Sequence, residues 1–92
     1  MANKNRDYAP IKAGLNKMSS TISETRTNGQ RLMTETESAE ATLRDHVAKK
    51  DIDQLKEMAT TIMKVAQEGE ERIRERLHEI EREEREFEEL DR

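Results

Sequence analysis

The sequence predicts an all-α fold, a long antiparallel helical hairpin that resembles a coiled coil. Two observations support this prediction. About half of the 92 residues are Ala, Glu, Lys, Leu or Arg, and apolar residues recur at alternating steps of three and four along most of the chain. Both features are typical of long helices that pair along one face. A chain of this length has room for one small domain, so we expect 1–92 to be a single helical hairpin.

The first helix is predicted over about 9–48. Asp7 provides a cap and Pro10 a first-turn proline, the usual signals of a helix start. Its stripe contains Ile11, Leu15, Met18, Ile22, Thr25, Gly29, Leu32, Thr36, Ala39, Leu43 and His46. Because Asn28-Gly29 is a turn dipeptide, a kink or break at 27–30 is an alternative to a continuous helix.

The second helix is predicted over about 52–91, after a turn at 48–51. Asp51 suits the N-cap, and Gln54 stands three residues later at the capping-box position. The stripe of this helix contains Ile52, Leu55, Ala59, Ile62, Ala66, Gly69, Ile73, Arg76, Ile80, Glu83, Phe87 and Leu90. A turn this short makes the two helices antiparallel neighbours.

Folding the chain about residue 49 places Gly29 opposite Gly69 and Met18 opposite Ile80. Glycine lets backbones approach closely and also loosens a helix. The two glycines are therefore predicted to mark a close approach of the helices or a hinge.

Further apolar residues beside the stripes make the apolar face wider than a single hairpin can bury. We therefore expect the hairpin to complete a four-helix bundle, with itself as a homodimer or with another helical protein. The predicted interface consists of Leu32, Leu43, Leu55, Met58, Ile62 and Met63.

Charge and composition exclude several classes of protein. Charged residues make up 41% of the chain, the hydrophobic set makes up 32%, and there is no cysteine. No apolar run approaches the length of a membrane span. Net charge changes from +4 in 1–33 to −6 in 67–92, which favours antiparallel pairing. The basic start lacks interleaved aromatic residues, so no nucleic-acid partner is expected. The absence of a cleaved signal predicts a cytoplasmic protein or one secreted by another route.

Nothing in the sequence resembles a catalytic nucleophile with its base or a phosphate loop, so we expect neither an enzyme nor a cofactor. Glu75 and His78 have the spacing that carboxylate-bridged metal bundles use, and the predicted register brings Glu24 near their level. These three residues are the candidate metal ligands. The segment is so rich in glutamate that such spacing arises by chance, and both side chains lie off the stripe. No metal is therefore the preferred prediction.

The length, the hairpin pattern and the acidity together resemble the small helix–turn–helix proteins that accompany type VII secretion substrates. The hallmark Trp-x-Gly of that family is missing from the turn, which contains His46 to Asp51. The segment from Phe87 to Asp91 is similar to the Phe-x-x-x-Asp signal of proteins that partner LXG toxins. The resemblance implies that Phe87 and Asp91 are targeting residues and that the hairpin binds a helical segment of a toxin.

Overall fold

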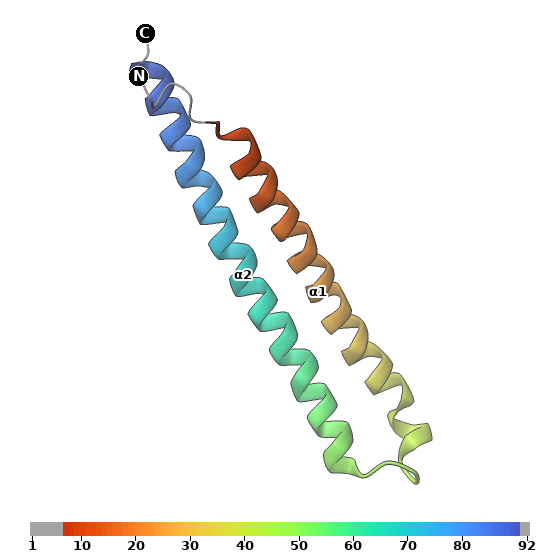
Figure 1. Ribbon diagram of the computed structural model, residues 1–92. Helices are drawn as coiled ribbons and strands as arrows, with labels where there is room; N and C mark the ends of the chain where they lie inside the picture. The colour runs from red at the N-terminus through yellow and green to blue at the C-terminus, as the bar shows by residue number, and fades with distance from the viewer. Residues whose placement is uncertain (1–6, 91–92) are drawn as a thin grey trace.

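The computed structural model describes residues 7–90, which form two helices lying antiparallel side by side (Figure 1). Helix α1 spans Ala9–Leu43 and helix α2 spans Lys49–Leu90. Residues 44–48 join them, and the hairpin is a rod with extents of 71 × 16 × 15 Å. The described residues contain no strand. The predicted all-α helical hairpin is confirmed.

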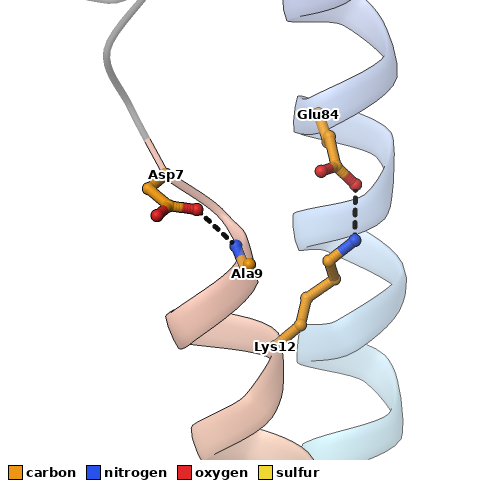
Figure 2. Close-up of polar contacts among 4 residues, drawn as sticks. All are labelled: Asp7, Ala9, Lys12 and Glu84. Carbon is orange, nitrogen blue, oxygen red and sulfur yellow. Dashed lines mark hydrogen bonds and ion pairs between the residues drawn. The ribbon is translucent and has the colours of Figure 1, made fainter.

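The start of α1 is held by a side chain outside the helix. A carboxylate oxygen of Asp7 accepts a hydrogen bond from the Ala9 amide at 3.0 Å (Figure 2), and Pro10 stands in the first turn. The Tyr8 carbonyl accepts the first bond of the ladder, from the Lys12 amide. The side chain of Asp7 thus satisfies one of the amides that a helix start leaves without an intrahelical partner.

Helix α1 ends at Leu43, five residues before the predicted position. The amides of His46 and Val47 both donate to the Leu43 carbonyl, each at 2.8 Å. These two bonds close the last turn and direct the chain toward the second helix. The connection is therefore 44–48 and not 48–51.

Helix α2 begins earlier than predicted, at Lys49. The amides of Asp51 and Ile52 already donate to the Ala48 carbonyl, at 3.0 and 3.2 Å. Asp51 therefore lies inside the first turn and is not the N-cap residue that the sequence suggested. Its negative charge still suits the positive end of the helix dipole at this position.

Helix α1 continues without interruption through Asn28 and Gly29. No described glycine has a positive φ, so the alternative of a break at 27–30 does not occur. The turn dipeptide is overridden because Gly29 is buried against the other helix.

The helices meet along a central seam whose residues recur every seven positions, as in a coiled coil. The buried residues of α2 are Ile52, Ala59, Ala66, Ile73 and Ile80. The matching positions of α1 are Leu15, Ile22, Gly29, Thr36 and Leu43, all buried or half-buried. At the open end, the rings of Tyr8 and Phe87 pack edge to face with centroids 6.4 Å apart. The seam thus has large side chains at both ends and small ones in its middle.

Gly29 and Gly69 each face a side chain of the other helix. A Cβ added to Gly29 would lie 2.9 Å from Ile62 Cγ2, 3.1 Å from Met63 Cγ and 3.3 Å from the carbonyl oxygen of Ala59. At Gly69, an added Cβ would lie 3.2 Å from the end of the Ile22 side chain. Of these two positions, Gly29 is therefore the more tightly packed against the other helix.

The two glycines do not face each other, so the predicted register is wrong by about seven residues, or one heptad. The Gly29 position faces Ala59, Ile62 and Met63, and Gly69 faces Ile22. The reason is the early end of α1, which moves the fold axis from residue 49 to about residue 46.

Interhelical ion pairs between residues that the structure describes accompany this register. Lys12 bonds to Glu84 at 2.7 Å (Figure 2), Arg26 approaches Glu70 at 3.3 Å, and Lys56 pairs with Glu40. Successive pairs lie two heptads apart on each helix, and the sign is reversed in the pair nearest the turn. All six side chains remain partly exposed, so each pair by itself contributes little to stability.

The three pairs form together only in the observed register. A slip of two heptads in one direction places Glu40 beside Glu70 and Arg26 beside Glu84. The opposite slip places Arg26 beside Lys56 and Lys12 beside Glu70. Each slip thus replaces three attractive pairs by one attractive and one repulsive contact.

The glycines give a matched series of variants. Gly14→Ala should stabilise the hairpin by about 0.5–1 kcal/mol, because an added Cβ meets nothing within 4 Å and alanine favours the helix. Gly29→Ala should destabilise it by about 1–2 kcal/mol, because the steric cost exceeds that gain. Gly69→Ala should fall between them, because only the flexible end of Ile22 must move. Urea denaturation followed by circular dichroism measures all three at one protein concentration. Equal stabilisation at positions 14 and 29 would contradict the close approach.

The ion pairs predict a loss of stability at alkaline pH. The hydrogen bond that Lys12 donates to Glu84 raises the pKa of Lys12 above 10.5, and the bond from Lys56 to Glu40 does the same for Lys56. A cation with a raised pKa stabilises the fold below its unfolded pKa, and this contribution disappears as pH rises through the folded value. The melting temperature should therefore fall above pH 10.5.

The control for this prediction is the double variant Lys12→Met, Lys56→Met, which retains the apolar stems without the ammonium groups. Its melting temperature should fall less steeply than that of the wild type between pH 9 and 12, measured by circular dichroism. Identical slopes would show that these two pairs do not contribute to the pH dependence.

Candidate interaction surface

The two sides of the central seam differ in burial. The ion-pair flank consists of the residues four positions after each seam residue: Lys12, Ser19, Arg26, Met33 and Glu40 on α1, and Lys56, Met63, Glu70, Leu77 and Glu84 on α2. The apolar flank consists of those three positions after: Ile11, Met18, Thr25, Leu32 and Ala39 on α1, and Leu55, Ile62, Gly69, Arg76 and Glu83 on α2. Every α2 residue of the ion-pair flank is half-buried, whereas Ile11, Met18 and Leu55 are exposed. On the apolar flank, Leu32, Ala39, Ile62, Gly69 and Glu83 are also half-buried, so the hairpin covers its more charged side more completely than its more apolar side.

The apolar flank is widest in the half of α2 that follows the turn. Leu55, Met58, Ile62 and Val65, which we name the docking strip, recur at steps of three, four and three. Leu55 is 38% exposed, Met58 54% and Val65 59%, while Ile62 is half-buried. This spacing places all four side chains along one face of the helix, over about two and a half turns.

The structure divides the six residues that the sequence assigned to the interface. Leu55, Met58 and Ile62 belong to the docking strip, and Leu32 lies half-buried on the same flank of α1. Leu43 is a seam residue, and Met63 belongs to the opposite flank, where it contacts the Gly29 position.

Val65 is the strip residue that the predicted interface lacked. It lies three residues after Ile62, just as Met58 lies three after Leu55, so the 3-4-3 spacing was the signal that could have found it.

An open groove runs beside the strip and is lined by Gln54, Glu57, Met58, Thr61 and Ile62. Gln54 and Thr61, each one residue before a strip residue, are uncharged, so the strip has a polar edge with little charge. The rest of α2 is different, because acidic and basic residues crowd the stretch beyond Val65. Among the described residues that line this groove, Glu57 is the one with a charge.

The three candidate metal ligands do not come together. Glu24, Glu75 and His78 are all exposed, and the contact of Ile22 with the Gly69 position places Glu24 near the level of Gln67, far from that of His78. Within residues 7–90, no group of three or more His, Asp or Glu side chains is arranged to hold a metal ion.

Only one of the two candidate targeting residues is described. Phe87 is half-buried and packs against Tyr8, where it closes the open end of the seam. Asp91 lies outside the described residues. Phe87 therefore has a structural role in the hairpin.

Neither helix, over the residues that the structure describes, contains a stretch long and apolar enough to cross a membrane. Comparisons of the chain with protein-family models, with curated proteins and with solved structures gave no match.

Proposed function

We propose that this chain is a non-enzymatic interaction module that binds a helical polypeptide along the docking strip. The observation that carries the proposal is the exposure of the docking strip. Its large apolar residues Leu55, Met58 and Val65 remain exposed, while charged residues such as Glu70 and Glu84 are half-buried on the other side of the seam. A contiguous apolar patch on a charged surface is typical of a protein–protein interface.

The thinness of the hairpin core supports the same proposal. Among the described residues, no large side chain is fully buried, and the middle of the seam contains only small residues. A further helix laid on the docking strip would bury apolar area beside this thin region. Recognition of a helix by apolar residues at such spacing is a common binding mode, and Met58 adapts readily to different partners.

The alternative proposal, an accessory of type VII secretion, uses the same surface, with a helical toxin segment as the partner. It also requires a secretion machinery to bind Phe87. Since Phe87 packs against Tyr8, such binding would compete with the contact that closes the open end of the seam. The general proposal of helix binding does not have this conflict.

Site-specific photo-crosslinking of the full chain in its source cells tests the proposed function. A photoreactive residue at position 58 should give covalent protein adducts, and one at position 18 should not. The two methionines are both 54% exposed, so the pair separates location from exposure. No adduct at position 58, or equal adducts at both positions, would refute binding along the strip.

A charged residue introduced into the docking strip should abolish binding of the partner without unfolding the hairpin. Leu55→Asp introduces a carboxylate that binding would have to desolvate, so the position-58 adducts should fall by at least tenfold. The matched variant Met18→Asp should leave them unchanged. Circular dichroism should show both variants as helical as the wild type. Adducts that persist at wild-type yield in Leu55→Asp would rule out the strip as the interface.

A further inference from the structure

We propose that the docking strip binds the docking strip of a second copy of this chain, with the two α2 helices antiparallel about a two-fold axis near residue 60. This inference rests on the proposed function and adds the identity and orientation of the partner. Three features of the strip and of the charge distribution support it.

The first feature is the spacing of the strip. Steps of three, four and three read the same in both directions along the helix. In an antiparallel pair, Leu55 therefore lies level with Val65 of the second copy, and Met58 with Ile62 of the second copy. An isologous interface requires this kind of self-complementary surface. Each large apolar residue meets another, and no apolar residue of the strip is left opposite a charge.

The second feature is the edge of the strip. The same axis brings Thr61 next to its own counterpart and places Gln54 near Glu68 of the second copy. Neither contact joins two like charges. A threonine at the two-fold axis is favourable because any charged residue there would meet an identical charge.

The third feature is the position of the acidic segment. Net charge is −6 in 67–92 and −2 in 34–66, so acid is concentrated toward the open end of the hairpin. An antiparallel pair centred near residue 60 overlaps the turn-proximal halves and leaves the two open ends pointing in opposite directions. A dimer with both turns at one end would bring the two acidic ends together, which costs repulsion. Charge therefore favours the antiparallel arrangement.

The purified full chain tests self-association directly. Sedimentation equilibrium over a concentration series should show an average mass rising from 10.7 kDa toward twice that value. Met58→Glu should remain monomeric up to at least tenfold higher concentration, whereas Met18→Glu should behave as the wild type. A monomer at all concentrations would overturn this inference. Strip-specific adducts to a different protein in cells would then leave the proposed function standing.

Cysteine crosslinking tests the orientation, and the absence of native cysteine makes single variants interpretable. Under mild oxidation, Thr61→Cys should form a disulfide with its own copy. Gln54→Cys alone should not crosslink, but a mixture of Gln54→Cys with Glu68→Cys should give the mixed dimer. Ready self-crosslinking of Gln54→Cys would show a parallel pair and would overturn the proposed two-fold arrangement.

Discussion

The close approach of the helices at Gly29 is the constraint on which the rest of the hairpin depends. An added Cβ there would lie 2.9 Å from the Ile62 side chain and 3.3 Å from the Ala59 carbonyl oxygen, so this position has no room for a side chain. The neighbouring seam positions are correspondingly small, at Thr36, Ala59 and Ala66. The larger seam residues, such as Ile22 and Ile73, lie toward the ends, where Tyr8 packs on Phe87. A seam that narrows in the middle has one alignment in which large and small residues fit, and packing therefore opposes any slip.

Charge reinforces the alignment that packing selects. The ion pairs of Lys12, Arg26 and Lys56 stand two heptads apart, and all three form together only in the observed alignment. The pairs occupy one flank only, and their side chains reach across that flank. The seam is consequently more completely covered on this side, and the apolar flank is more exposed to solvent.

The fold class and the start of α1 were predicted correctly from the sequence. The predictions failed at the ion-pair flank, where polar side chains are half-buried, and at the turn. Seven-residue recurrence correctly identified Ile22, Ile73 and the other seam positions, since these are apolar or small in both helices. The periodicity then selected the apolar flank as the second contact position, because Ile11 and Met18 are more hydrophobic than Lys12 and Ser19. An apolar pattern cannot show that a lysine stem and a carboxylate cover a seam better than an exposed methionine. The predicted position of the turn was also wrong. Asp51 is a residue type that often caps helices, but backbone hydrogen bonds to the carbonyls of Leu43 and Ala48 determine where the two helices end and begin.

The location of the docking strip follows from the same constraint that fixes the seam. Close approach requires small residues at Ala59 and Ala66, so the large apolar residues of this part of α2 stand beside the seam and not in it. The hairpin therefore buries little apolar area in the stretch where it exposes the most. A helix bound along Leu55, Met58 and Val65 would supply burial next to the thinnest part of the core, and its binding energy would add to the stability of the folded hairpin. Stability and association are thus coupled through one segment of α2, because the residues that would complete the core are the residues that face a partner.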